Sequence, residues 1–402
     1  MQEPGKILVV SQHYPPDATT TATYIGTIAR ALAADCRVVV LSGSPHSASG
    51  HTANPEVIEI AAPAAPKDAL ARRAFAIVWL ALRMFVATLR QADRRDVVFC
   101  VTTPFTLPYG VMLAARLRGA ATVLLIYDLY PEALQAAGLA KASSLTARLI
   151  RRANALLFRR LDAIITIGRD VAPLLLAYPG VAREKIHFIP NWTLLPAAYR
   201  AVAADNPFRA GRQTQFIVGL SGNLGFTHHP RTVFEAARLL RDNGDIHFML
   251  SGWGIGWNEL SDLQDKEKLG NVTLLPPAPQ DELIDFLASA DIWVIPYRRN
   301  IAGVSIPSRL YNLLAVGRAI IVAAEENTEA ALVISEEKIG WAVPPEEPAA
   351  LADAIVRAAR DRGDVADKGR RAAAAAAKYS PDVALARYRD VILRTASRDL
   401  RS

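Results

Sequence analysis

A basic and an amide side chain interrupt an otherwise apolar helix in the second half of the chain. The stretch AGVSIPSRLYNLLAVGRAI follows the apolar run DIWVIPY and predicts a loop, then a helix whose first turn holds Pro307. Arg309 and Asn312 are three residues apart, so they share one face of that helix. An arginine binds oxyanions through two parallel hydrogen bonds, and helix N-terminal N–H groups near Ser305 and Ser308 suit phosphate or hydroxyl oxygens.

Two glycine-rich loops follow apolar runs earlier in the second half. In LSGNLGFTHHPRTVFEAARLL, Gly222 and Gly225 allow close backbone approach, and the helix that follows presents free N–H groups to an anion. Arg231 in its first turn opposes the helix dipole, which is unfavourable unless a phosphate lies there. A plain glycine turn with an exposed arginine explains this pattern equally well. The second loop, LSGWGIGWNEL, contains Gly252 but has Trp257 where a dinucleotide fingerprint needs glycine.

Acidic and histidine side chains follow apolar runs in the first half. His13 and Asp17 lie in SQHYPPDATTT, and Asp128 and Glu132 lie in LIYDLYPEALQAAG. Each also has an ordinary explanation, as a half-buried histidine bonded to backbone or as acids favoured by a helix dipole. The chain has no Asp-x-Asp and no His/Cys cluster at metal-binding spacing, which disfavours a metal-dependent transferase. No glycine follows the first strand, which disfavours a nicotinamide dehydrogenase.

Short apolar runs alternate with helical patterns along the whole chain. They are KILVVS, CRVVVLS, DVVFCVT, ATVLLIY, DAIITIG and KIHFIP in the first half, and QFIVGLSG, IHFMLSG, NVTLLP, DIWVIPY and AIIVAA in the second. Continuously apolar strands are buried on both faces, as in a parallel sheet covered by helices. We therefore expect an α/β chain with two Rossmann-like, doubly wound domains that face a cleft.

The Pro- and Ala-rich stretch IPNWTLLPAAYRAVAADNPFRAGRQ marks the join between the two domains. We expect an N-terminal domain at 1–195 and a second domain at 208–378. The remaining segment, 379–402, is expected to form a helix that packs back toward the N-terminal domain.

Composition and charge fit a folded protein with an anionic partner. The 402 residues are 51% hydrophobic and 21% charged, and the two cysteines are too few for a disulfide framework. The net charge of +7 belongs to residues 1–195, which hold 21 Lys+Arg against 13 Asp+Glu, whereas the remainder holds 25 against 26. Such asymmetry suggests nucleic acid, phospholipid head groups or a phosphorylated substrate. We expect no signal peptide, and the longest apolar run, AFAIVWLAL, is too short to span a bilayer.

Together these stretches resemble glycosyltransferase family 4, nearest to the branch that builds bacterial capsule, O-antigen or colanic-acid-type exopolysaccharide. The resemblance rests on the order and spacing of GKILVVSQHYPPD, YDLYPEAL, IPNW, SGNLG, LSGWG, ADIWVIPY and GVSIPSRLYNLLAVGRAI over nearly the full chain. It implies a GT-B fold, a nucleotide-sugar donor on the C-terminal domain and an acceptor on the N-terminal domain. It also implies a retaining hexosyltransferase-type enzyme with no required metal and no cofactor beyond the donor, which is expected to be UDP- or GDP-linked.

The resemblance also assigns site residues. It implies donor binding by Gly222, Asn223, Gly225, His228, Arg231, Gly252, Ser305, Pro307, Ser308, Arg309 and Asn312. Acceptor binding is expected at His13, Asp17, Asp128 and Glu132, with His13, Asp128 and Arg309 as catalytic residues. In this branch the basic residue matching Arg309 reaches the donor diphosphate, and the residue matching Asn312 faces the ribose.

The chain departs from the family pattern at two places. The family motif of two glutamates separated by seven residues falls on Val304 and Asn312, so both glutamates are missing. Relatives often carry a basic residue soon after the second glycine of the first loop, where Phe226 and Thr227 stand here, so Arg231 or His228 would have to supply that charge. These departures keep open a catalytically silent GT-B scaffold subunit; a nucleotide-sugar epimerase is a further alternative that shares the fold.

The basic first half predicts a peripheral membrane protein on the inner face of the plasma membrane. The stretches 68–95 and 143–162 combine apolar residues with arginines, among them Arg148, Arg151 and Arg152. In a family whose acceptors are often polyprenyl-diphosphate sugars, these stretches favour docking on anionic lipid. Ordinary domain-surface helices remain the alternative. Nucleic acid is not expected, because no nucleic-acid motif accompanies the basic residues.

Overall fold

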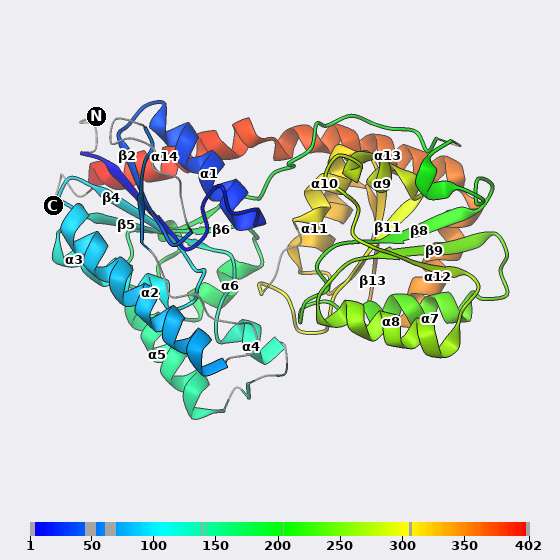
Figure 1. Ribbon diagram of the computed structural model, residues 1–402, viewed down its shortest axis with the longest axis horizontal. Helices are drawn as coiled ribbons and strands as arrows, with labels where there is room; N and C mark the ends of the chain where they lie inside the picture. Colours follow the sequence, from blue (N-terminus) through cyan, green and yellow to red (C-terminus); the bar gives the residue numbers. More distant parts are fainter. Residues whose placement is uncertain are drawn as a thin grey trace.

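Two parallel α/β sheets, one in each half of the chain, organise the structure. The computed structural model describes residues 5–44, 54–60, 70–136, 138, 140–141, 143–203, 205–304 and 308–398 (Figure 1). The two domains lie side by side along the long axis of the molecule (Figure 1). Along the described residues, no helix combines the length and the apolar composition needed to cross a bilayer.

The first domain contains a seven-stranded sheet in the order β3-β2-β1-β4-β5-β6-β7, with every neighbouring pair parallel. The strands are β1 (Ile7–Ser11), β2 (Val38–Ser42), β3 (Glu56–Glu59), β4 (Val97–Val101), β5 (Ala121–Ile126), β6 (Ala163–Thr166) and β7 (Ile186–Phe188). The order reverses direction at β1, which is the switch point where doubly wound folds bind ligands.

Helices cover both faces of this sheet. They are α1 (Thr20–Ala33), α2 (Leu70–Gln91), α3 (Leu107–Leu117), α4 (Glu132–Ala136), α5 (Leu145–Phe158), α6 (Val171–Leu176) and the short 3₁₀ turn η1 (Arg183–Lys185). Leu8 and Val10 share one core with side chains of α2, α3 and α5, and Ile7 and Val9 share the other with α1. This alternation follows from the two-residue period of a strand.

The second domain contains a six-stranded parallel sheet in the order β10-β9-β8-β11-β12-β13. Its strands are β8 (Phe216–Leu220), β9 (Ile246–Ser251), β10 (Val272–Leu275), β11 (Ile292–Pro296), β12 (Ala319–Ala323) and β13 (Gly340–Val343). Its helices are α7 (Pro230–Leu239), α8 (Ile255–Glu267), α9 (Leu283–Ser289), α10 (Arg309–Ala315), α11 (Glu329–Glu337), α12 (Pro348–Arg360) and α13 (Arg362–Ala375), with the 3₁₀ turns η2 (Pro207–Arg209) and η3 (Ala376–Tyr379).

The last helix, α14 (Pro381–Arg398), returns to the first domain (Figure 1). It contacts β4, β5 and α1. Tyr388 is buried in the core of the first sheet, where its ring meets those of Phe99 and Trp192 edge-on, each with centroids 6.2 Å apart. The chain therefore crosses between the two domains twice, once before β8 and once before α14.

The structure confirms the predicted class, two doubly wound parallel domains. The sequence patterns missed two strands, β3 and β13, which lie at the edges of the two sheets. Both are partly exposed, so neither gives the continuously apolar run that marks a central strand.

Candidate active site

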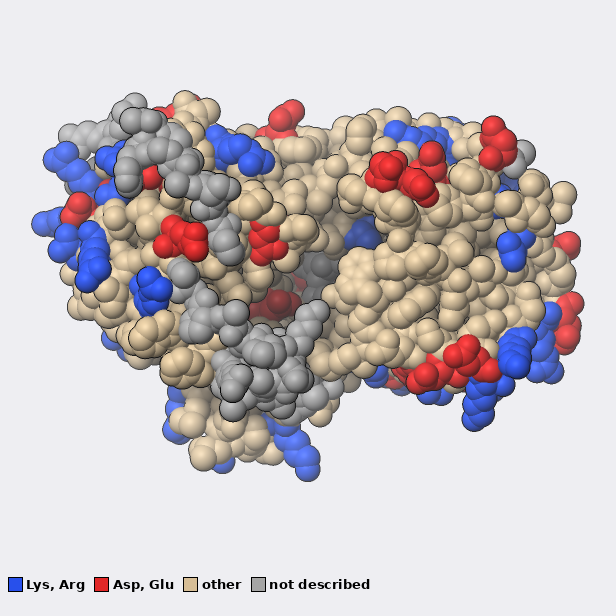
Figure 2. Space-filling model, in the orientation of Figure 1, with Lys and Arg blue, Asp and Glu red and all other residues tan. Residues whose placement is uncertain are grey.

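The carboxyl ends of both sheets border a hollow between the domains, which Figure 2 shows on one face of the molecule. Within it lies a cavity of about 150 Å³. Its lining residues are Thr20, Thr21, Tyr24, Thr103, Tyr127, Asp128, Ile167, Asn191 and Ser308. Ser308 comes from the second domain and the others from the first, so the cavity is shared between the two domains.

Asp128 supplies a carboxylate to this cavity from the loop after β5. The hydroxyl oxygen of Thr102 accepts the backbone N–H groups of Tyr127 at 3.0 Å and of Asp128 at 3.3 Å, which fixes that loop. The side chain faces the cavity, where the protein around it displaces much of the bulk water. This desolvation raises the pKa of Asp128. A carboxylate in this setting gains a proton more readily than an exposed aspartate does.

Two buried polar atoms at the cavity have no partner among the described residues. They are Oδ1 of Asn191 and the hydroxyl of Tyr127. Buried polar groups are normally hydrogen-bonded, so both are available to a bound ligand. Neither was predicted as a site residue, although Asn191 belongs to the stretch IPNW on which the family resemblance partly rests.

His13 and Asp17 form a pair at the carboxyl end of β1. Nδ1 of His13 lies 2.5 Å from Oδ2 of Asp17, which also accepts the hydroxyl of Ser44 at 3.1 Å. Burial raises the pKa of Asp17, but hydrogen bonds from His13, from the Thr19 N–H and from Ser44 outweigh it and lower the pKa overall. Asp17 is therefore a charged acceptor that orients the ring of His13.

Glu132 is engaged inside the first domain. The hydroxyl of Tyr178 donates to its two carboxylate oxygens at 3.0 and 3.2 Å, and Arg151 lies 3.3 Å from Oε1. This carboxylate joins α4 to α5 and the end of α6. The structure thus places it in an internal network rather than on the lining of the cavity.

A glycine cradle in the second domain holds Arg309. Its guanidinium donates to the backbone oxygens of Ser221 and Asn223, the latter at 2.6 Å. The φ of Gly222 is +104°, which side-chain-bearing residues rarely adopt, and a Cβ there would lie a tight 3.1 Å from the guanidinium carbon, so glycine is favoured at this position. The loop after β9 closes against the same turn, because a Cβ at Gly252 would lie 2.5 Å from the Gly222 oxygen.

Arg309 has no carboxylate partner among the residues that the structure describes. Burial lowers its pKa to about 10, with a smaller opposing effect from Tyr297, so the guanidinium stays charged at neutral pH. A buried charge is normally paired with an opposite charge. The cradle therefore presents an uncompensated cation, one residue beyond the Ser308 that lines the shared cavity.

His228 and Arg231 do not add a second free cation to this cradle. Burial and the charge of Arg309 lower the pKa of His228 well below its usual value, so its ring is neutral. Its Nε2 is buried without a partner among the described residues. Arg231 donates to Oε1 of Glu259 at 2.7 Å, on α8. Neither of these two residues therefore presents a free positive charge beside Arg309.

Asn312 lies away from the glycine cradle and contacts the connection between the domains. Its Oδ1 accepts the backbone N–H of Leu194 at 3.1 Å, so in this structure it holds the connection instead of facing open space beside Arg309. Val304, the position of the first missing glutamate, is 5% exposed and belongs to a core cluster of the second domain. Ser305 and Pro307, two of the predicted donor-binding residues, lie outside the described residues.

The remaining predicted donor residues line the same turn. Asn223 forms an isolated bridge with Trp253, and a Cβ at Gly225 would meet only Oδ1 of Asn223, at 3.9 Å.

Over the described ranges, no group of three or more His, Cys, Asp or Glu side chains is placed to hold a metal ion.

Known glycosyltransferase domains match both halves of the chain. Residues 19–192 match a glycosyl transferase 4-like domain, and residues 215–361 match glycosyl transferases group 1. WbjE of Pseudomonas aeruginosa, named as a glycosyltransferase, is 28% identical over 299 residues, 73% of each chain. WcaI of Escherichia coli K12, named as a colanic acid biosynthesis glycosyl transferase, is 31% identical over 273 residues, 65% of each chain and so just under two thirds of its length.

Solved structures share the fold at low sequence identity. Sucrose-phosphate synthase of Thermosynechococcus elongatus superposes with a TM-score of 0.72 at 16% identity, covering 95% of this chain and 97% of that one. HepE of Anabaena in complex with UDP gives 0.71 at 14% identity, covering 96% and 98%. Both family domains occur here in sequence, each on its own sheet, and the chain belongs to the glycosyltransferases of family 4, with the GT-B fold.

Proposed function

We propose that this glycosyltransferase moves a sugar from a UDP- or GDP-sugar to a lipid-linked, polyprenyl-diphosphate saccharide during bacterial surface polysaccharide synthesis, with retention at the anomeric carbon. WbjE and WcaI are both named as glycosyltransferases, the name of WcaI supports a role in polysaccharide synthesis, and HepE, of the same fold, binds UDP.

The observation that carries this proposal is the uncompensated charge of Arg309 in its glycine cradle. Its two bonds to carbonyl oxygens fix the guanidinium without neutralising it. A donor diphosphate would supply the missing negative charge. The neutral ring of His228, with its unpartnered Nε2, would add one uncharged hydrogen bond beside it.

Catalysis would then be mainly electrostatic. When the bond between the anomeric carbon and the diphosphate breaks, negative charge grows on the leaving nucleoside diphosphate, and a fixed cation stabilises that charge. Across the cavity, Asp128 would accept a hydrogen bond from the acceptor hydroxyl and orient it, with the His13–Asp17 pair at the neighbouring strand end. Holding both reactants in one cavity removes much of the entropic barrier.

We also propose that the first domain docks on anionic lipid at the inner face of the plasma membrane. Several of its large apolar side chains are exposed: Phe75, Val78, Trp79 and Leu82 on α2, Leu113 and Leu117 on α3, and Leu145, Leu149 and Leu156 on α5. Helices α2 and α3 pack together, and an apolar cavity of about 200 Å³ lies between α3 and α5, so the three helices form one face.

Basic side chains surround that face. Figure 2 shows Lys and Arg side chains along the outer and lower edges of the first domain, with a few acidic side chains among them. On α5 and directly after it, Arg148, Arg152, Arg159 and Arg160 are exposed. Apolar side chains that enter the lipid headgroup region, flanked by basic ones, are typical of helices that lie on an anionic bilayer.

The test of the reaction is release of nucleoside diphosphate by the purified full-length protein. A panel of UDP- and GDP-sugars is supplied with lipid extracted from polysaccharide-producing cells, with and without excess EDTA. We expect release with one donor, dependent on the lipid and unaffected by the chelator. Release that stops with EDTA and returns with a divalent ion would contradict a metal-independent reaction.

A catalytically silent scaffold subunit is the second candidate, and the two missing glutamates favour it. Val304 is buried and Asn312 is bonded to the connection between the domains, so neither replaces a carboxylate in the cradle. A scaffold of this kind would bind nucleotide without releasing diphosphate from any donor. Calorimetry with UDP and GDP alongside the release assay separates the two candidates.

A further inference from the structure

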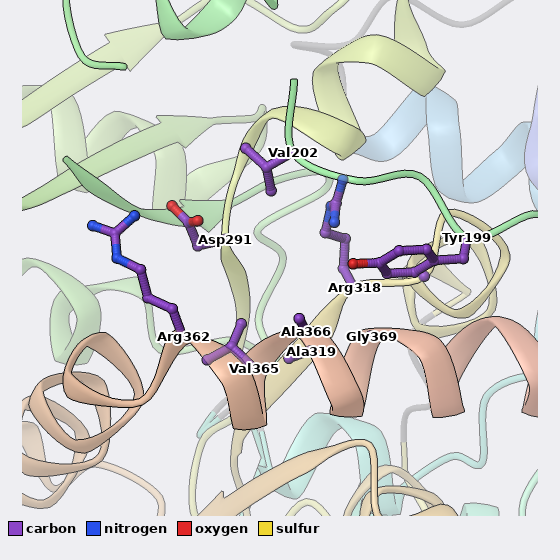
Figure 3. Close-up of a pocket in the computed structure, with 10 residues that line it drawn as sticks. Tyr199, Val202, Asp291, Arg318, Ala319, Arg362, Val365, Ala366 and Gly369 are labelled. Carbon is purple, nitrogen blue, oxygen red and sulfur yellow. The ribbon is translucent and has the colours of Figure 1, made fainter. Parts of the chain in front are cut away.

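A second cavity, of about 180 Å³, lies at the amino ends of the strands of the second sheet (Figure 3). The glycine cradle lies at their carboxyl ends. Two of its lining residues, Asp291 and Arg318, come directly before β11 and β12, whereas Gly222 and Gly252 come after β8 and β9. In a parallel sheet these positions are at opposite ends of the strands. The cavity is therefore separate from the candidate active site.

Arg318 is the most buried cation of this cavity. It is 3% exposed, and its Nη2 donates to the backbone oxygen of Ala288 at 2.8 Å. Its Nε is buried without a partner among the described residues. Figure 3 shows the side chain rising from the start of β12 toward the connection between the domains, between Val202 and Tyr199.

The acid in the cavity is already neutralised by another cation. Oδ2 of Asp291 lies 3.0 Å from Nη1 of Arg209 and accepts the backbone N–H of Ile217 at 2.7 Å. Arg209 is 2% exposed, so this pair is internal. At the rim, Arg362 donates to the backbone oxygen of Thr214 at 3.0 Å.

The other acids near the cavity belong to the start of α13 and are engaged there. Oδ1 of Asp361 accepts the N–H of Asp364, and Oδ1 of Asp364 lies 2.8 Å from Lys368. Asp291 is paired with Arg209, and among the described residues neither Arg318 nor Arg362 forms an ion pair with a carboxylate.

We propose that this cavity is a binding site for a phosphate group, held by the buried guanidinium of Arg318 with Arg362 at its rim. The ligand is free inorganic phosphate or pyrophosphate, or the phosphate of a nucleotide. A guanidinium with an unused N–H in a polar cavity suits a tetrahedral oxyanion. The site is independent of the proposed transfer reaction.

The bound phosphate would adjoin the connection between the domains. Tyr199 packs on two glycines, since a Cβ at Gly317, whose φ is +68°, would lie 2.8 Å from its ring, and a Cβ at Gly369 would lie 3.2 Å from it. The N–H of Ala198 donates to the Ala315 oxygen at 2.8 Å. A phosphate bound between Arg318 and this segment would therefore hold the connection against the second domain.

The experiment measures phosphate binding by calorimetry in an Arg309→Ala background, which removes the cation of the glycine cradle. Inorganic phosphate, pyrophosphate and UMP are titrated separately at constant ionic strength. We expect saturable binding of at least one of them, and the preferred ligand identifies the source. Absence of binding by all three would overturn the proposal.

Site-directed variants then locate the binding. Arg318→Gln should weaken it about tenfold or more, the effect of losing a charge-assisted hydrogen bond. Ala366→Glu keeps Arg318 but adds a carboxylate to the lining, and it should abolish binding even if Arg318→Gln fails to fold. Arg360→Gln, an exposed arginine outside the cavity, is the matched control. Binding that survives both cavity variants would overturn the proposal.

Hydrogen exchange gives a readout that depends on position in the chain. The backbone amides of residues 198–203 should exchange more slowly with saturating ligand, and this protection should vanish in Ala366→Glu. Ligand binding that leaves exchange in this segment unchanged would contradict a site beside the connection between the domains.

Discussion

At the scale of single residues, the candidate active site depends on one cation and one carboxylate from different domains. Arg309 is fixed by two backbone oxygens and by the space that Gly222 leaves, whereas Asp128 follows β5 of the other sheet. Asp128 lies in the loop after β5, and Arg309 begins the helix after the β11 loop. Both therefore lie on the carboxyl side of a parallel sheet, where such folds bind ligands.

Donor binding should depend on Arg309 far more than on Asn312. Arg309→Ala should weaken nucleoside diphosphate binding about tenfold to a hundredfold, because a charge-assisted hydrogen bond contributes roughly 1.5–3 kcal/mol. Asn312→Ala should cost less, because its Oδ1 contacts the Leu194 N–H. Isothermal titration calorimetry measures both, with the exposed Arg299→Ala as control. Equal, small losses in both variants would count against a diphosphate at Arg309.

Turnover should depend on the charged form of Asp128. Burial raises the pKa of this carboxyl, so as pH falls the charge is lost at a higher pH than the value of about 4 for an exposed aspartate. The acid limb of the kcat profile should therefore lie above that value. Asp128→Asn should lower kcat, leave donor binding intact and remove the acid limb.

The control for Asp128 is a carboxylate inside the first domain. Glu132→Gln changes a group bonded to Tyr178 and Arg151, so it should affect thermal stability more than the pH profile. An acid limb that persists unchanged in Asp128→Asn would show that another group titrates.

At the scale of secondary-structure elements, helices α2, α3 and α5 both build the core and leave an apolar surface. Met84, Met112 and Phe158 are buried against the sheet, one from each helix. On the outward side, Phe75 and Trp79 are exposed and stacked, with ring centroids 6.0 Å apart. Exposed apolar patches of this kind mark interaction sites.

Vesicle binding should require the basic residues of this face. Each basic side chain near an anionic bilayer contributes about 1 kcal/mol, within a Debye length of about 8 Å at physiological salt. Replacing Arg148, Arg152, Arg159 and Arg160 by Gln should therefore abolish co-sedimentation with anionic vesicles. Arg151 is retained because it contacts Glu132.

Two comparisons make the vesicle experiment decisive. A matched variant with Arg357, Arg360, Arg370 and Arg371 changed to Gln on the second domain should bind as the unmodified protein does. Trp79→Gln should reduce the part of the binding that resists high salt. Binding that is equal on neutral and anionic vesicles would show that α5 is only a domain surface.

At the scale of the whole molecule, Arg169 and Asp170 of the first domain contact the second domain across the cleft. Arg169, just after β6, donates from Nε to Oε2 of Glu329 at 2.9 Å and from Nη1 to Oε1 of Glu336 at 2.7 Å. Asp170 accepts the backbone N–H groups of Gly303 at 2.9 Å and of Glu329 at 3.1 Å. These bonds link the start of α6 to α11.

Removing Arg169 should destabilise the protein, because Glu329 is 1% exposed and would lose its partner. Arg169→Ala should cost less than the roughly 3–5 kcal/mol typical of fully buried pairs, since the arginine side chain is 35% exposed. Denaturant unfolding measures the loss. Adding Glu329→Gln to this variant should recover part of the lost stability. Arg299→Ala, which removes the exposed ion pair with Glu347, should cost little stability. A loss no larger than that of Arg299→Ala would show that the contact contributes nothing.

The sequence by itself determined the fold class and the strand ends that carry the site. Buried central strands are continuously apolar, so their runs were visible in KILVVS and QFIVGLSG, and the loops after them had to meet at one edge of each sheet. It could not reveal the edge strands β3 and β13, whose partly exposed residues are held by pairing with β2 and β12. Such pairing is a tertiary contact with no local pattern.

Only the tertiary structure decided which polar candidate residues already have partners within the protein. Glu132, Arg231 and Asn312 had suitable types and spacing, but each found a partner from a distant segment, and burial removed the charge expected of His228. Within the part of the chain that the structure describes, the guanidinium of Arg309 donates to carbonyl oxygens and forms no ion pair. Whether the charge or polar group of a side chain has a partner depends on neighbours that folding brings together, and the local sequence does not contain that information.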